Sequence, residues 1–180
     1  KCYGTKSLNS DCPVTNRTIF RLASMTKPIT AVAALILAER GMMSLDDGID
    51  KYLPSFRNIK IRDVQGNVSE PKRIPTVRNI LTHSSGIGSV AEKLMLMMPD
   101  DRKSLDSSVS FYLNSGLDFE PESRQMYSGT AAFDVLTKVI ETVTGADYFT
   151  FLKKEIFVPC KMVDTTFVPD AEQQARMIKM

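Results

Sequence analysis

Apolar residues recur along this chain mostly at the spacing of helices. Residues 29–38 are apolar at almost every position, as in a helix that is buried on every side. Pro28 suits the first turn of such a helix and Gly41 suits its end, so we expect a helix that begins near Ser24 and ends before Gly41. A second long helix is expected at residues 130–144, where apolar residues keep a helical spacing up to the glycine that follows.

Shorter elements are expected between and after these two helices. Helices are predicted at residues 44–56, 77–81, 104–116 and 148–156. Pro54 would end the first of these, and Thr76 can cap the second. Residues 58–75 alternate but contain Gly66 and two prolines, which predicts a weak hairpin or a loop. The Met-rich patch at residues 95–98 fits either core filling or an adaptable pocket wall.

Composition and charge narrow the class of protein. The 180 residues carry a net charge of +2, with 43% hydrophobic and 24% charged residues, as in an ordinary globular protein. No cluster of Lys and Arg points to nucleic acid, and the apolar run is shorter than the roughly 20 residues of a membrane span. The single histidine, His83, excludes a multi-histidine metal site. Cys2, Cys12 and Cys160 leave two alternatives: a Cys2–Cys12 disulfide or three separate thiols.

A serine and a lysine stand three residues apart at the start of the first apolar helix. Ser24 and Lys27 would share one helix face. There, a neutral Lys27 amine can accept the proton of the Ser24 hydroxyl and so make the hydroxyl a nucleophile. Burial beside an apolar helix disfavours the charged form of a lysine. The alternative is a helix-capping serine and a surface lysine. Spacing alone does not decide, because Ser69 and Lys72 match the same pattern in a charged, proline-broken stretch.

Four segments in register carry a resemblance to a known family. The segment "FRLASMTKPITAVAALILAERG", the loop "TVRNILTHSSGIG", the segment "FEPESRQMYSG" and the segment "PCKMVDTTF" resemble, in the same order, motifs of the serine β-lactamase-related superfamily. That superfamily holds class C β-lactamases, D,D-peptidases, D-aminopeptidases and esterases of β-lactamase fold. The resemblance covers nearly all of residues 18–169.

The resemblance implies a role for several residues. Ser24 would be the acylated nucleophile, Lys27 its activating neighbour and Tyr127 a second acid/base. Ser128, Gly129 and Met25 would line the substrate site. A neutral Lys27 could act as a base, whereas a charged Lys27 could stabilise the phenolate of Tyr127, but it cannot do both at the same time. We therefore expect Lys27 and Tyr127 to be a coupled pair that shares a proton. His83 is expected to be a hydrogen-bonded loop residue and not a catalyst.

Four positions depart from the family pattern. Gly129 stands where relatives often carry an asparagine that binds the substrate amide, which favours ester cleavage over amide cleavage. Glu122 replaces a turn glycine, and Cys160-Lys161 replaces Leu-Gly. No His- or Lys-Thr-Gly triplet follows Tyr127, so the motif that completes the family's pocket is missing from these 180 residues.

The expected fold is therefore mainly α. The chain resembles the helical region of a β-lactamase/transpeptidase-like α+β fold, with most of the central antiparallel sheet absent from it. Residues 1–19, which are polar and turn-rich, would be a remnant of an N-terminal strand region. Residues 20–170 would form an incomplete helical domain, and residues 171–180 would begin a missing C-terminal region.

The expected function is a serine hydrolase that acts through an acyl-enzyme on Ser24. Its substrate would be a carboxylic ester, or alternatively a β-lactam or D-amino-acid amide. A catalytically inactive, truncated binding or remnant protein is the competing hypothesis. No cofactor, metal, nucleic acid or membrane span is expected, no compartment is assigned, and the exposed side of the first long helix could support self-association.

Overall fold

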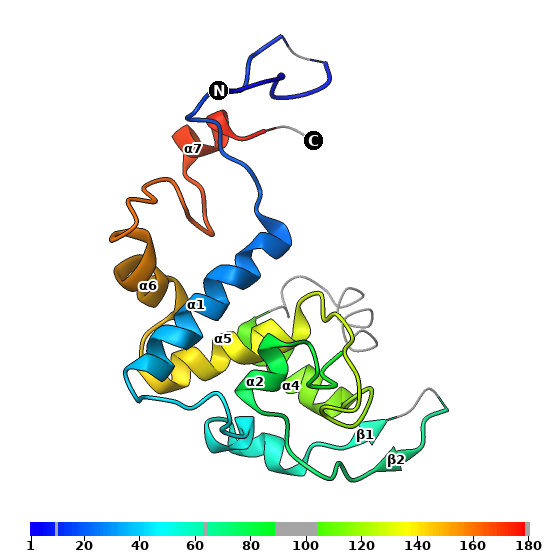
Figure 1. The fold of residues 1–180 in the computed structure, drawn as a ribbon. Coiled ribbons are helices and arrows are strands. Elements are labelled where there is room, and N and C mark those ends of the chain that lie inside the picture. Colours follow the sequence, from blue (N-terminus) through cyan, green and yellow to red (C-terminus); the bar gives the residue numbers. More distant parts are fainter. Residues whose placement is uncertain (10, 63–64, 89–103, 179–180) are drawn as a thin grey trace. The chain divides into compact units, whose positions relative to one another are not determined.

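The computed structural model describes residues 1–9, 11–62, 65–88 and 104–178, and Figure 1 traces its elements. The chain divides into two compact units. We call residues 27–148 the helical unit, and residues 1–26 with 149–180 the terminal unit. Each is described by itself. The three-part division expected from the sequence stays a prediction, and the Met-rich patch at residues 95–98 lies outside the described residues.

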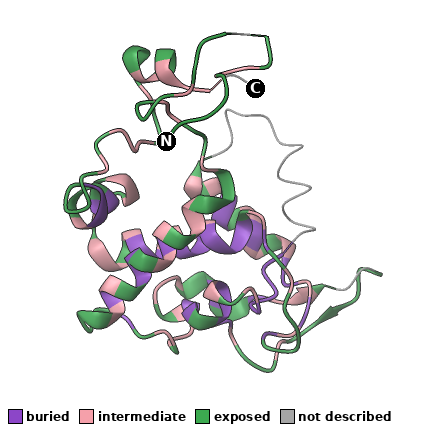
Figure 2. Cartoon of the chain, turned by 45° about the horizontal axis from the view of Figure 1, so that its top comes forward, coloured by how far each residue is buried: buried purple, intermediate pink, exposed green. Residues whose placement is uncertain are grey.

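Helix α5, Ala131–Thr144, forms the centre of the helical unit's core. Its buried residues are Ala131, Ala132, Phe133, Val135, Leu136, Val139 and Ile140. It packs against α4, Leu105–Ser115, and α2, Val77–Leu81. Buried residues gather along these helices in Figure 2. Each fully buried Val, Leu, Ile or Phe side chain contributes about 1.5–3 kcal/mol, so this face holds the unit together.

The ends of these helices follow the local signals in the sequence. Thr76 and Asn79 form a capping box at the start of α2, and Ser104 and Ser107 form another at the start of α4. Gly145 adopts a left-handed conformation that ends α5. The predictions for residues 77–81, 104–116 and 130–144 are therefore confirmed.

Helix α1, Thr26–Glu39, buries only one of its faces. Thr30, Ala33, Ala34 and Leu37 are buried, whereas Val32 and Leu35 are 45% and 48% exposed. The apolar side that we expected to lack a neighbour is thus exposed, and self-association through it stays a prediction. In the described part of the chain, no helix has both the length and the apolar character that a membrane crossing requires.

Residues 44–56 do not form the predicted helix. Two 3-10 turns stand there instead, Ile49–Lys51 and Pro54–Asn58, and Pro54 begins the second turn where it was expected to end a helix. The Ile49 N–H donates to the carbonyl of Pro75 at 2.9 Å, so long-range pairing replaces a helical hydrogen bond. The side chains of Tyr52 and Lys51 donate hydrogen bonds to the Asp47 carboxylate, which joins residues within this segment. These hydrogen bonds lower the pKa of Asp47 to about 2.

The described residues contain one small sheet. Strands β1, Ile61–Arg62, and β2, Val68–Ser69, pair antiparallel, with Ile61 opposite Ser69 and Arg62 opposite Val68. The predicted weak hairpin is confirmed. With several helices and this one two-stranded sheet, the described part of the chain is mainly α, as the sequence indicated.

The terminal unit joins the two ends of the chain. Ile19 pairs with Met177, and Arg176 of helix α7, Ala171–Arg176, bonds to Asp164, Glu172 and the carbonyl of Arg17. The sequence analysis missed α7, although the Asp170…Gln173 capping box was its signal.

The predicted helix at residues 148–156 is present in two parts. Helix α6, Tyr148–Leu152, continues as a π-helical turn, Lys153–Phe157. No disulfide is present among the described residues, and all three cysteines are exposed, which favours separate thiols.

Candidate functional site

Ser24 lies in a 3-10 turn, Ala23–Met25, that directly precedes α1. Ser24 is exposed, and Met25 is 68% exposed. Ala23 has a φ of 47°, a left-handed conformation that is strained for a residue with a Cβ. Ser24 belongs to the terminal unit and Lys27 to the helical unit. The predicted closeness of their side chains therefore stays a prediction.

Lys27 and Tyr127 meet within the helical unit. The Nζ atom of Lys27 lies 4.9 Å from the centroid of the Tyr127 ring and 5.6 Å from that of Phe133. The same ammonium donates a hydrogen bond to the carbonyl of Gly129. A cation over an aromatic ring is worth about 0.5–2 kcal/mol, depending on its hydration. Tyr127 is 55% exposed.

The loop that carries Tyr127, residues 117–130, is bonded along its length to the turn after α2. We call it the tyrosine loop. The Asp118 N–H donates to the carbonyl of Gly86 at 2.7 Å, and the Glu122 N–H donates to that of Ser84 at 2.9 Å. Gly86 has a φ of 78°, and a Cβ there would come within 2.3 Å of the Phe119 carbonyl oxygen. Only glycine permits so close an approach, so the two segments form one packed layer.

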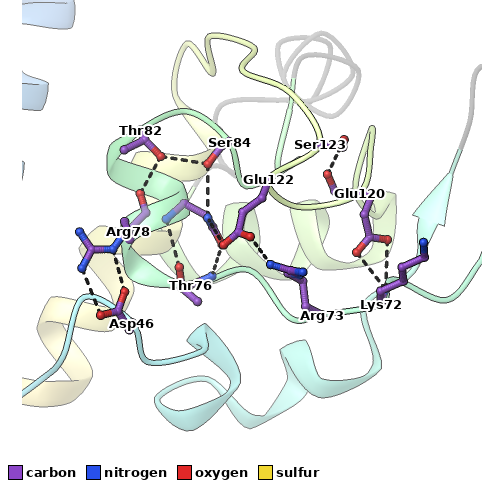
Figure 3. Close-up of polar contacts among 11 residues, drawn as sticks. Asp46, Lys72, Arg73, Thr76, Arg78, Thr82, Ser84, Glu120, Glu122 and Ser123 are labelled. Atoms are coloured by element: carbon purple, nitrogen blue, oxygen red, sulfur yellow. Dashed lines mark hydrogen bonds and ion pairs between the residues drawn. The ribbon is translucent and has the colours of Figure 1, made fainter.

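Glu122 connects the tyrosine loop to the start of α2 (Figure 3). Its carboxylate forms an ion pair with Arg73 and accepts a hydrogen bond from the buried amide of Asn79 at 3.3 Å. Asn79 also belongs to the capping box and donates to Ser84. Glu122 has a φ of 68°, so it keeps the left-handed turn in which the family pattern has glycine. The sequence identified the substitution but not its contacts.

Ser128 and Gly129 have definite partners in the structure. The Ser128 hydroxyl is buried and accepts the Ala132 N–H at 3.0 Å, which adds a cap to the start of α5. The Gly129 carbonyl accepts from Lys27. Roles of Ser128, Gly129 and Met25 in substrate binding stay predictions.

His83 lies close to Tyr127, although the sequence analysis gave it no catalytic role. As expected, it is a hydrogen-bonded loop residue: its Nδ1 accepts the Ser128 N–H at 3.2 Å. Its ring centroid lies 4.7 Å from that of Tyr127. The loop "THSSGIG" was part of the family resemblance, but nothing in the spacing of His83 and Tyr127 indicated that they meet.

The described residues offer no obvious metal centre. Within the ranges that the structure covers, no group of three or more His, Cys, Asp or Glu side chains could hold a metal ion. The side chains that the structure brings together at the site are those of Lys27, Tyr127 and His83.

The family model described as Beta-lactamase matches residues 1–178. The chain belongs to the beta-lactamase family.

Individual relatives agree with this assignment. The chain is 36% identical over 178 residues to esterase EstB of Burkholderia gladioli, covering 93% of this chain and 43% of that protein. It is 29% identical to penicillin-binding protein 4* of Bacillus subtilis (strain 168), covering 91% of this chain and 34% of the other. Simvastatin synthase (LovD) from Aspergillus terreus superposes with a TM-score of 0.79 at 28% identity, over 99% of this chain and 48% of that one.

The chain thus spans less than half the length of these relatives. Membership in a family that includes an esterase and a penicillin-binding protein supports the class of serine hydrolases.

Proposed function

We propose that the protein carrying this chain is a serine hydrolase that cleaves carboxylic esters through an acyl-enzyme on Ser24. The observation that carries this proposal is the meeting of Lys27 and Tyr127, with Nζ 4.9 Å from the ring centroid. The family resemblance assigns acid/base roles to these two residues. They come from a helix and a loop that are far apart in the sequence, so their meeting is a product of the fold.

The proposed reaction has two halves. The Ser24 Oγ attacks the carbonyl carbon of the ester while its proton passes to the Lys27–Tyr127 pair. The pair gives this proton to the alcohol oxygen as the C–O bond breaks, and the acyl group remains on Ser24. Water then attacks the acyl carbon and gives its proton to the pair, and Ser24 regains a proton as the carboxylic acid leaves. A coupled pair that shares one proton can serve both halves.

Two features favour an ester over an amide. Gly129 lacks the side chain with which family members often bind a substrate amide, and its carbonyl accepts from Lys27. EstB, the relative at 36% identity, is named an esterase. Cleavage of a β-lactam or of a D-amino-acid amide is the alternative within the same mechanism.

Labelling with a fluorophosphonate tests the nucleophile in the protein as its gene encodes it. Native protein should form a covalent adduct that Ser24→Ala abolishes. Ser69→Ala is the matched control, because Ser69 begins the other Ser-x-x-Lys sequence, in an exposed strand. It should label like the native protein. An adduct that persists in Ser24→Ala would overturn the proposal.

The acid/base pair and the substrate class need separate measurements. Tyr127→Phe keeps the ring beside Lys27 and removes only the hydroxyl, so acylation should slow by about 10²–10⁴-fold with little change in KM.

The substrate class is tested by comparing the rates of hydrolysis of p-nitrophenyl butyrate, nitrocefin and D-alanine p-nitroanilide. A greater rate on nitrocefin or on the anilide than on the ester would overturn the preference for esters.

A further inference from the structure

His83 is bonded to the backbone on both sides of Tyr127. The Met126 N–H donates to the His83 carbonyl at 2.9 Å, and the Ser128 N–H donates to its Nδ1 at 3.2 Å. The residues before and after Tyr127 are therefore fastened to one residue of another segment. Loss of the imidazole would release the second of these bonds and leave the first.

The imidazole also contacts the Tyr127 ring itself. The two ring centroids lie 4.7 Å apart with the planes inclined at 38°. Phe133 of α5, which is buried, lies 5.5 Å from the imidazole and limits its movement. Aromatic pairs at these distances add about 0.5–1.5 kcal/mol beyond the burial of their area.

The backbone of His83 is itself in an unfavourable conformation. Its φ is 56°, in the left-handed region that glycine adopts freely and that other residues adopt at a cost. The turn that imposes this conformation is fixed by hydrogen bonds from His83 N to Ile80 O and from Ser84 N to Asn79 O. The contacts of the imidazole with Tyr127 and Ser128 offset that cost.

We propose that His83 is a positioning residue for Tyr127: it fixes the phenol beside Lys27 through the Ser128 N–H and through ring contact. The inference rests on the proposed function, since it assigns a purpose to the position of the acid/base tyrosine. Because Nδ1 accepts a hydrogen bond, the neutral imidazole carries its proton on Nε2. A neutral ring adds no second positive charge beside the Lys27 ammonium.

Two substitutions separate the hydrogen bond from the fold. In His83→Gly the ring and its contacts are lost while the left-handed backbone becomes free of strain, and these two contributions oppose each other, so the stability of the protein should change little. In His83→Asn a side-chain oxygen can replace Nδ1 as the acceptor, and asparagine tolerates the left-handed conformation. Both variants keep the His83 carbonyl that accepts from Met126.

The rate of Ser24 acylation by a p-nitrophenyl ester is the main readout. We expect His83→Gly to lower kcat by about tenfold or more, because a misplacement of about 1 Å can cost 10²-fold. His83→Asn should retain most of the rate, and KM should change little in either variant. Exchange of the Ser128 amide hydrogen, measured by NMR, should be slow in the native protein and in His83→Asn and faster in His83→Gly.

The outcomes distinguish this inference from the proposed function. Native kcat in His83→Gly, a loss in His83→Asn as large as that in His83→Gly, or a loss confined to KM would overturn the positioning role. A fluorophosphonate adduct that still forms in Ser24→Ala would instead overturn the proposed function. In that case the exchange of the Ser128 amide still decides whether His83 holds the tyrosine loop: equal exchange in the native protein and in His83→Gly would refute it.

Discussion

Two helical segments of this chain end in the same backbone motif but with different consequences for the side chain at the left-handed position. At the end of α2, His83 N donates to Ile80 O at 3.1 Å and Ser84 N donates to Asn79 O at 2.8 Å. This pair of hydrogen bonds defines a Schellman motif, with His83 at the position that glycine usually occupies.

The segment Lys153–Phe157 ends in the same way. Lys161 N donates to Val158 O at 3.1 Å and Met162 N donates to Phe157 O at 2.8 Å. Lys161 has a φ of 55°, and His83 has a φ of 56°. The Lys161 side chain is exposed, and no hydrogen bond or ion pair joins it to another residue in the described part of the chain. The family pattern has glycine at this position.

The comparison teaches that the same backbone cost is offset in one turn and not in the other. The imidazole of His83 bonds to Ser128 and contacts Tyr127, whereas Lys161 gains nothing comparable within the described residues. Gly41 ends α1 with the same two hydrogen bonds and no Cβ, and serves as the reference. The predictions below concern the free energy of unfolding, measured by chemical denaturation.

Asn79→Ala should have the largest effect, because it loosens the turn at His83 from within. Asn79 is 2% exposed, completes the capping box of α2 and donates to Glu122 and Ser84. Loss of a cap and of buried hydrogen bonds should destabilise the protein by about 2–3 kcal/mol. Asn114→Ala, at an exposed position of α4, is the control and should change the stability by less than about 0.5 kcal/mol. Equal effects would contradict this account.

Gly41→Ala should place in α1 the same strain that His83 and Lys161 carry. Gly41 has a φ of 67°, and a Cβ there would meet no atom within 4 Å, so only the backbone conformation is at issue. We expect a loss of about 1 kcal/mol, the left-handed cost reduced by the lower entropy of the unfolded alanine chain. Gly41→Asn should lose less, since asparagine tolerates this conformation. An unchanged free energy of unfolding in Gly41→Ala would show that the backbone at this position is not strained.

Lys161→Gly should act in the opposite direction. Removal of the Cβ relieves a left-handed residue whose side chain has no bond to a described residue, and glycine raises the entropy of the unfolded chain. The balance should be a gain of about 0.5–1 kcal/mol. Lys154→Gly, within the preceding helical turn, should instead destabilise by about 1 kcal/mol. The same sign in both variants would refute the comparison.

Glu122→Gly should have the smallest effect, because two contributions oppose each other. Glycine relieves the left-handed backbone by about 1 kcal/mol, and loss of the contacts with Arg73 and Asn79 costs about as much. Glu122→Ala loses the contacts without relieving the backbone, so it should destabilise by about 1–2 kcal/mol. If alanine and glycine behave alike, the backbone at Glu122 is not strained.

Much of the helical unit was predictable because its signals are local. The 3.6-residue period of α5, the capping residues Thr76 and Ser104, and the glycines after α1 and α5 act over one or two turns of chain. The family motifs were also local strings, so the resemblance identified the family before any contact was known. Helix α7 had such a signal at Asp170 and was nevertheless overlooked.

The remaining features depend on segments that are distant in the sequence. Residues 44–56 form 3-10 turns because Ile49 pairs with Pro75, which no local pattern indicates. The sequence named Lys27 and Tyr127 as candidates, but only the tertiary structure brought Lys27 beside the rings of Tyr127 and of Phe133 in α5.

By itself, the sequence determined the helical class, the family and the residue types available for chemistry. The tertiary structure decided that the Gly129 carbonyl accepts a hydrogen bond from Lys27. It also decided that His83 accepts hydrogen bonds from the backbone N–H groups on both sides of Tyr127. The physical reason is that helix period and capping are properties of neighbouring residues. A contact between distant residues depends on how the whole chain closes its loops and fills its core, and no short stretch of sequence contains that information.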